Sequence, residues 1–256
     1  MARLGMVIDL QRCVGCSACA LACKAEHNTR TRGNGQSYNY ADFLMASEGT
    51  FPNTTYFAMP VLCNHCTDAP CVKACPVEPK AMFKTPEGIT MHAPERCIGC
   101  RQCQQACPYS SLELDASSLR GESYSVISFN PHDAEPQPQW ADKVALIAGG
   151  TASGVETAKR AGAAVPAMNQ FAAGDAMPLR KAGVVEKCNF CYHRTSNGLA
   201  PACVEVCPAK ARIFGDQEDP SSEISRVLKA KKSFRLKESR GTKPNVHYVG
   251  RYNARG

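Results

Sequence analysis

The chain has 256 residues, 44% of them hydrophobic, so it can bury a core as one large domain or as two small ones. Its 30 Lys and Arg residues exceed its 23 Asp and Glu residues, and the resulting formal charge of +7 would by itself suit an anionic partner such as nucleic acid. The longest aliphatic run, VALIA at 144–148, is far shorter than the roughly 20 residues that cross a bilayer, so we expect no transmembrane helix.

The first residues, MARLGMVIDLQRC, contain no twin arginine, no apolar signal region and no small-residue cleavage site. We therefore expect no export signal here, although a chain without one can still cross a membrane as the folded passenger of a partner. Within this stretch, the short apolar run GMVIDL at 5–10 predicts a β-strand.

Four cysteines follow in CVGCSACALAC at 13–23, separated by gaps of two, two and three residues. A helix that begins within this motif is expected to continue through KAEHN at 24–28, because Lys24 stands where a proline would otherwise end it. The segment 24–60 contains the polar stretch TRTRGNGQS and is predicted to be an excursion loop.

A second motif, CNHCTDAPCVKACP, begins at Cys63, and a third, CIGCRQCQQACP, begins at Cys97. Between them AMFK and GITMH are predicted strands on either side of the turn TPEG. Pro76 and Pro108 follow the last cysteine of each motif, where we expect them to end short helices. After the third motif, VISFN is a further predicted strand.

The fourth motif starts with CNFC at Cys188 and resumes eleven residues later with CVEVCP. Residues 115–183 before it are predicted to be an insertion. ARIFGD after it is a predicted strand. The basic, polar stretch KAKKSFRLKESRGTKPN within 217–256 would usually be a solvated surface. Because the strand-like NVHYVG follows it, the alternative is an extended C-terminal arm that lies on a larger partner.

All sixteen cysteines fall in these four motifs, and three chemistries could explain them. Disulfides are disfavoured because tight cysteine triplets would force strained local pairings. Structural zinc sites use two pairs of cysteines, whereas each unit here is a triplet plus one. A triplet with a fourth cysteine further on is typical of bacterial ferredoxins, in which the fourth cysteine ligates the neighbouring cluster. The spacing therefore predicts 4Fe-4S clusters.

Iron-sulfur clusters also account for the excess positive charge. Sixteen thiolates around four cubane cores of charge 2+ contribute about −8, which brings the loaded protein close to neutral. A nucleic-acid partner is therefore not needed to explain the composition.

Two histidines lie close to the cysteines. His65 stands between two cysteines of the second motif and His193 lies two residues beyond Cys191. A histidine can replace a cysteine as a cluster ligand, but no cysteine is missing from the motifs. We expect these histidines to support the ligands or an interface instead.

The order of strand, cluster loop, short helix and strand recurs with each motif. It predicts an α+β protein of two pseudo-symmetric bacterial-type two-cluster ferredoxin modules, with long loop insertions and the extended C-terminal arm.

With four such motifs, the sequence resembles the four-cluster ferredoxin subunits of the molybdopterin oxidoreductase superfamily, the dimethyl-sulfoxide reductase type. Within that group it most resembles the small subunits of respiratory arsenate reductase and anaerobic arsenite oxidase. The stretches that carry this likeness are LGMVIDLQRCVGC, EGTFPN before Cys63, CNHCTDAPCVKACP, CNFCYHR with ARIFGDQEDP, and GTKPNVHYV. Polysulfide, thiosulfate and tetrathionate reductase subunits are somewhat less similar.

The resemblance implies how the cysteines share four clusters. The four sets of ligands are Cys13, Cys16, Cys19 with Cys207; Cys188, Cys191, Cys203 with Cys23; Cys63, Cys66, Cys71 with Cys107; and Cys97, Cys100, Cys103 with Cys75. Motifs one and four then build one module, 1–60 with 184–216, and motifs two and three build the other, 61–114. Nitrate reductase relatives replace one cysteine by tryptophan, and this sequence has no such replacement, so we expect four 4Fe-4S clusters.

By the same resemblance, the chain is a non-catalytic subunit in anaerobic respiration. It would carry electrons between a large molybdenum-bis(pyranopterin) catalytic subunit and a membrane quinone anchor or a c-type cytochrome. The first module would face the catalytic subunit and the second the electron donor or acceptor. We expect the chain in the periplasm, exported with a signal-bearing catalytic partner, with the cytoplasm as the alternative.

Two other functions make different demands on the sequence. An enzyme in its own right would need a His, Asp and Ser constellation or paired carboxylates at catalytic spacing, and the sequence offers neither. A zinc-rich nucleic-acid module would contain zinc and would bind DNA in a salt-sensitive way.

Overall fold

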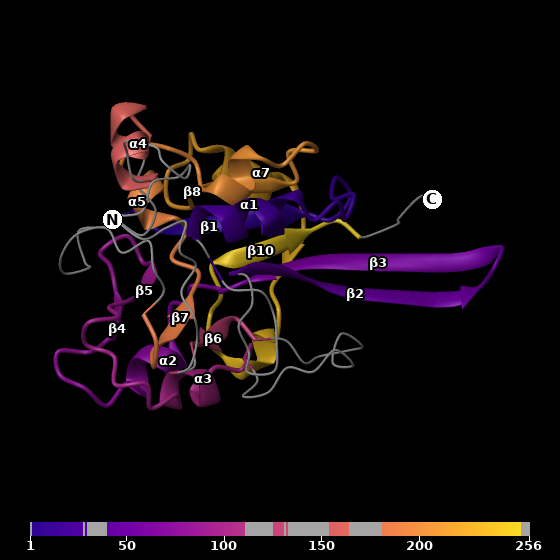
Figure 1. The fold of residues 1–256 in the computed structure, drawn as a ribbon. Helices are drawn as coiled ribbons and strands as arrows, with labels where there is room; N and C mark the ends of the chain where they lie inside the picture. The colour runs from indigo at the N-terminus through magenta and orange to yellow at the C-terminus, as the bar shows by residue number, and fades with distance from the viewer. Residues whose placement is uncertain are drawn as a thin grey trace.

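The computed structural model describes residues 2–27, 29, 40–110, 125–130, 132, 154–163 and 181–251. Most of the predicted insertion at 115–183 therefore lies outside the described residues. In the described part, no helix has both the length and the apolar character needed to cross a membrane. The described chain mixes short helices with small β-sheets (Figure 1), as the α+β prediction requires.

The largest sheet has four strands in the order β8, β1, β10, β9. Its strands are β1 (Leu4–Asp9), β8 (Arg212–Asp216), β9 (Ser233–Phe234) and β10 (Val246–Val249). β1 pairs antiparallel with β8 and parallel with β10. Met6, Val7 and Ile8 are fully buried, which explains why an uninterrupted apolar run forms a central strand. The predicted strands GMVIDL and ARIFGD are thus present and paired with each other.

The C-terminal segment is not an extended arm in the part that the structure describes. It forms α7 (Glu223–Ala230), β9, the 3-10 helix η3 (Glu238–Arg240) and β10. Val246 and Tyr248 are fully buried, because β10 inserts between β1 and β9. Hydrophobic burial of this short apolar strand therefore returns the chain to the core.

Short helices carry or adjoin most of the cysteines. They are α1 (Ala18–His27), α2 (Pro70–Lys73), α3 (Gln102–Ala106), α5 (Tyr192–Thr195) and α6 (Ala202–Glu205). α1 packs against α6, and α2 packs against α3. As predicted, the first helix continues to His27, whereas α2 and α3 end before Pro76 and Pro108.

Two further sheets are antiparallel pairs of three-residue strands. One consists of β4 (Met82–Lys84) and β5 (Thr90–His92), and the other of β6 (Ile127–Phe129) and β7 (Val185–Lys187). β4, β5 and β6 are the strands predicted from AMFK, GITMH and VISFN. Within the predicted insertion, the structure also describes α4 (Gly154–Arg160), whose second half is mostly exposed.

A long hairpin occupies much of the segment expected to be an excursion loop at 24–60. β2 (Ala41–Thr50) and β3 (Asn53–Leu62) pair antiparallel in a register that sets Ala41 opposite Leu62 and Thr50 opposite Asn53. The inner half of β3 is buried and its outer half is exposed. Figure 1 shows the outer half projecting away from the rest of the molecule. The loop prediction was wrong here because it rested on the polar residues before the hairpin.

The burial pattern of β3 predicts an unequal contribution of its two halves to stability. Val61→Ala removes buried methyl groups from the core and should lower the free energy of unfolding by about 2 kcal/mol. Tyr56→Ala, in the exposed half of the same strand, should change it by about 0.5 kcal/mol or less. Denaturant unfolding under anaerobic conditions, followed by circular dichroism, measures both. Equal losses would contradict this account of the hairpin.

Candidate metal centres

All sixteen cysteines lie in the described residues, and all are free thiols. They stand on loops and short helices at the edges of the sheets. The structure gathers them into four groups, of which two line pockets near the surface and two are buried.

One surface pocket is lined by four cysteines from both ends of the chain. Cys13, Cys16, Cys19 and Cys207 lie around a space of about 350 Å³, counted with its opening to solvent. The pairing of β1 with β8 brings these residues together, because β1 leads into the first motif and β8 leaves the fourth. The backbone N–H of Ala211 donates to Cys207 Sγ at 3.3 Å. Such donors stabilise negative charge on sulfur.

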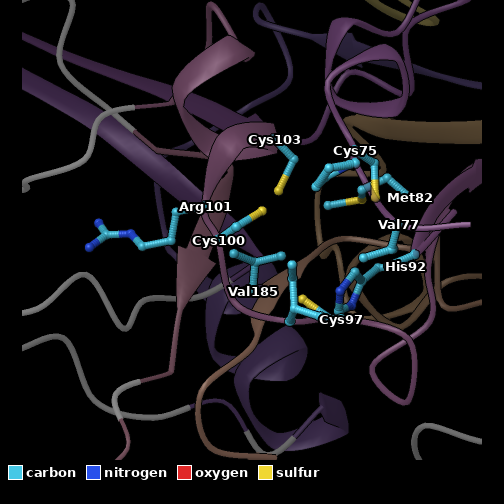
Figure 2. A pocket seen from close by; sticks show the side chains of 12 residues that line it. Cys75, Val77, Met82, His92, Cys97, Cys100, Arg101, Cys103 and Val185 are labelled. Atoms are coloured by element: carbon cyan, nitrogen blue, oxygen red, sulfur yellow. The ribbon is translucent and has the colours of Figure 1, made fainter.

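The other surface pocket is lined by Cys75, Cys97, Cys100 and Cys103, around a space of about 300 Å³. Figure 2 shows these side chains around the space, with Arg101 directed away from it. The backbone N–H of Gly99 donates to Cys97 Sγ at 3.4 Å.

A glycine is required at position 99. Its φ of +70° is in the left-handed region, and a Cβ there would lie 2.1 Å from the carbonyl oxygen of Gly183. The loop between Cys97 and Cys100 therefore depends on the missing side chain.

The remaining eight cysteines form two buried groups. In one group, Cys23 and Cys191 interact electrostatically with each other and with Cys188 and Cys203. In the other, Cys71 interacts with Cys63 and Cys66, and Cys107 interacts with Cys71 and Cys63. Cys23 thus lies near the first three cysteines of the fourth motif, and Cys107 lies near Cys63 and Cys71 of the second.

The four groups adjoin one another in series. Cys203 interacts with Cys19 of the first surface pocket, and Cys188 interacts with Cys63 of the other buried group. Cys71 interacts in turn with Cys103 of the second surface pocket. The arrangement runs from one pocket through two buried groups to the other pocket.

The two ends of this series reach the surface. Cys16 and Cys100 are exposed, whereas every cysteine of the two middle groups is buried. An exposed aliphatic side chain stands beside each, Val14 at one end and Ile98 at the other.

Burial makes the thiolate form unfavourable at several of these cysteines. It raises the pKa of Cys66 to about 11, and it raises the pKa of Cys71, Cys103 and Cys188 to about 12, with neighbouring cysteines adding to the effect. A thiolate binds metal and a thiol does not, so a cationic core must displace these protons. Four sulfur donors around one space suit a group that brings its own positive charge. The residues therefore fit iron-sulfur clusters.

The ligands of a cluster do not converge on one atom. In a 4Fe-4S cluster four separate irons are held by four cysteines, so the sulfurs stand around a cube rather than around a point. Consistent with this spread, no group of three His, Cys, Asp or Glu side chains in the described ranges could hold a single metal ion.

His65 lies in the core and takes part in backbone contacts. It is fully buried, it stacks on Phe190 with ring centroids 3.6 Å apart, and its Nδ1 accepts a hydrogen bond from the N–H of Thr90 at 3.2 Å. Asn245 contacts the same residue through a hydrogen bond from its side-chain amide to the His65 carbonyl.

His193 belongs to a polar cluster beside the buried group of the first and fourth motifs. Its Nε2 lies 2.6 Å from Oε1 of Glu26, and Arg194 lies 3.4 Å from the other oxygen of this carboxylate. Burial would raise the pKa of Glu26, but the hydrogen bond from His193 and the charges of His193 and Arg194 outweigh it, so this pKa is lowered. Both histidines thus support neighbouring residues in the described structure.

Sequence reasoning missed three side chains near the cysteines. His27 places its Nε2 3.2 Å from Cys191 Sγ, Lys187 donates to the carbonyl of Cys188 at 2.6 Å, and the buried Arg212 lines the first pocket. His27 stands four residues after Cys23, one helical turn further on the same face, which is a usable signal. Lys187 directly precedes Cys188 in a strand-like run, which is also a usable signal. Arg212 stands five residues after Cys207, and its place among the cysteines follows from the fold alone.

Comparison with known proteins gives the family. A model described as 4Fe-4S dicluster domain matches residues 54–122 and 176–217, which hold motifs two, three and four. The chain is 44% identical over 248 residues to the iron-sulfur subunit of arsenate respiratory reductase from Shewanella sp. strain ANA-3, covering 96% of both chains.

More distant relatives are named for other reductases. The chain is 34% identical to a protein from Halobacterium salinarum named as an iron-sulfur subunit of dimethyl sulfoxide reductase, covering 97% of this chain and 79% of the relative. It is 32% identical to the B subunit of tetrathionate reductase from Salmonella typhimurium, covering 97% of this chain and 72% of the relative.

The loop at Gly99 offers a test of one centre. Gly99→Ala should remove about four iron atoms per chain, because the added Cβ collides with Gly183 and displaces the loop that carries Cys97 and Cys100. Gly198→Ala is the matched control, since Gly198 has a similar φ of +75° but open space around its Cβ. Iron is measured on anaerobically purified protein, and full iron content in Gly99→Ala would refute the steric argument.

Proposed function

We infer the function from membership: the chain belongs to the family of 4Fe-4S electron-transfer subunits of oxidoreductase complexes. We propose that it is the non-catalytic electron carrier of an arsenate reductase or arsenite oxidase type of complex, and that catalysis takes place on a separate molybdopterin subunit. The observation that carries this proposal is the unbroken series of four cysteine groups that reaches the surface at both ends.

We propose four clusters, each held by one of four sets of cysteines. The sets are Cys13, Cys16, Cys19 and Cys207; Cys23, Cys188, Cys191 and Cys203; Cys63, Cys66, Cys71 and Cys107; and Cys75, Cys97, Cys100 and Cys103. The two pockets support the first and last sets, because each is lined by one complete set. Electrostatic interactions within the two buried groups support the others.

This partition divides the chain into two modules. One would contain motifs one and four, in 1–60 and 184–216, and the other would contain motifs two and three, in 61–114. The packing of α1 on α6 and of α2 on α3 supports the division. The interaction of Cys188 with Cys63 is the point at which electrons would pass between the modules.

The residues of this chain exclude water, donate hydrogen bonds to sulfur and expose the two ends of the series in the proposed function. Each bound 4Fe-4S cluster can accept and release one electron at a potential that its surroundings set. Apolar side chains such as Ile8 and Phe43 exclude water from the first pocket, and Val77 and Val185 do so at the second. Backbone donors at Gly99, Phe190 and Ala211 hold negative charge on the sulfurs. The exposed ends allow close approach of a partner.

The proposed partners are argued from family membership and from the two exposed ends of the series of cysteine groups. We propose that the end with Cys16 faces the molybdenum subunit, and that the end with Cys100 faces a quinone-linked membrane anchor or a c-type cytochrome. A relative named as the iron-sulfur subunit of a menaquinone reductase supports a quinone-linked partner. We also propose a periplasmic location, reached together with a signal-bearing catalytic partner.

Arsenic chemistry is proposed because of the relative with 44% identity over 96% of both chains. The alternative is the same role in a polysulfide, thiosulfate or tetrathionate reductase. Deleting the gene for this chain in its host should abolish electron flow from the respiratory chain to arsenate, or from arsenite in the reverse direction. Restoring the gene should restore it. Loss of tetrathionate reduction with arsenate reduction intact would favour the alternative.

The partition can be tested at Cys207 and Cys203, which lie close in sequence but in different sets. Cys207→Ser and Cys16→Ser should perturb the same EPR signal of the reduced protein, because both residues hold the first cluster. Cys203→Ser should perturb a different signal, that of the cluster with Cys23. A shared signal for Cys203→Ser and Cys207→Ser would contradict the partition.

A further inference from the structure

Arg212 is a buried cation at the start of β8. It is only 3% exposed, although a guanidinium keeps its positive charge at every physiological pH. Its register partner is Ile8 in the fully buried part of β1. A charge in such a place is unfavourable unless negative charge lies nearby.

The guanidinium faces sulfur atoms. Nη1 lies 3.6 Å from Met6 Sδ and 3.9 Å from Cys203 Sγ. It also lines the pocket of the first proposed set, together with Cys13, Cys16, Cys19 and Cys207. Arg212 therefore lies between the first proposed set and Cys203 of the second.

No carboxylate compensates this charge in the described structure. Nη2 is buried and has no hydrogen-bond partner among the described residues. A buried, unpartnered donor beside four cysteines is suited to an anion that occupies the space between them.

Two lysines of the core, the buried Lys187 and the half-buried Lys84, are satisfied in a different way. Lys187 donates to the carbonyls of Cys188 and Thr90, and Lys84 donates to those of Cys66 and Gly88. Both lysines thus cross-link backbone segments. The side chain of Arg212 donates to sulfur instead, which sets its role apart.

We propose that Arg212 sets the reduction potentials of the first two clusters. One-electron reduction adds negative charge to a cluster, and a fixed cation nearby stabilises that charge, so it raises the midpoint potential. One guanidinium between two adjacent clusters raises both potentials together. Its attraction for both clusters offsets part of the repulsion between them when both are reduced, so this end of the series can hold two electrons more easily. This inference rests on the proposed partition of the cysteines.

The test is a redox titration of the full chain, purified anaerobically with whatever partners it binds, and followed by EPR. In Arg212→Met, two of the four midpoint potentials should fall. At a fixed potential, the ratio of oxidised to reduced cluster should then rise at least about tenfold, which corresponds to a fall of about 59 mV for a one-electron couple. The other two should not move. Arg212→Lys keeps the positive charge and should leave both potentials close to their wild-type values.

Arg226→Met is the matched control, because it removes the same charge from an exposed position on α7 and should move no potential. Four unchanged potentials in Arg212→Met, with full iron content, would overturn the inference and leave the proposed function intact. An equal shift of all four would also overturn it. Arg212→Met and Arg212→Gln could both lose iron while Arg212→Lys keeps it. That result would overturn the inference, because the charge would then be needed to hold the clusters and not to set their potentials. A wild-type chain without iron would instead refute the proposed function.

Discussion

Negative charge on buried sulfur is the constraint on which this fold depends. Most of the sixteen cysteines are buried, and only Cys16 and Cys100 are exposed. A thiolate in a low-dielectric interior is stable only beside positive charge or hydrogen-bond donors. Iron supplies most of that charge in the proposed holoprotein. The protein adds backbone donors and the cations Lys84, Lys187 and Arg212.

The topology meets this constraint by joining the two ends of the chain. β1 enters the first motif and β8 leaves the fourth, and their antiparallel pairing holds both sides of the first pocket. β10 then adds to β1 in parallel and closes the core. A ligand set that draws on both ends of the sequence makes the folding of this region depend on long-range contacts. Metal binding and folding are coupled under such conditions.

The cysteine motifs and the short apolar runs beside them allow much of the site to be predicted from the sequence. The cysteine spacings point to clusters because one loop can hold three corners of a cube, and the strands around TPEG and before Cys13 are short apolar runs beside turn residues. The hairpin of β2 and β3 and the inward course of β10 depend on tertiary burial, which a local pattern does not encode. Arg212 was missed for the same reason, since only the fold shows that its side chain lies among cysteines of two different motifs.

The central claim is that this chain holds four clusters for a molybdenum partner, and elemental analysis tests it most directly. The tagged chain is isolated from its host without oxygen, and iron, zinc, molybdenum and tungsten are counted per chain. The account predicts about 16 iron atoms and close to one molybdenum. The same iron without molybdenum or tungsten would indicate a free polyferredoxin, and zinc in place of iron would contradict the account.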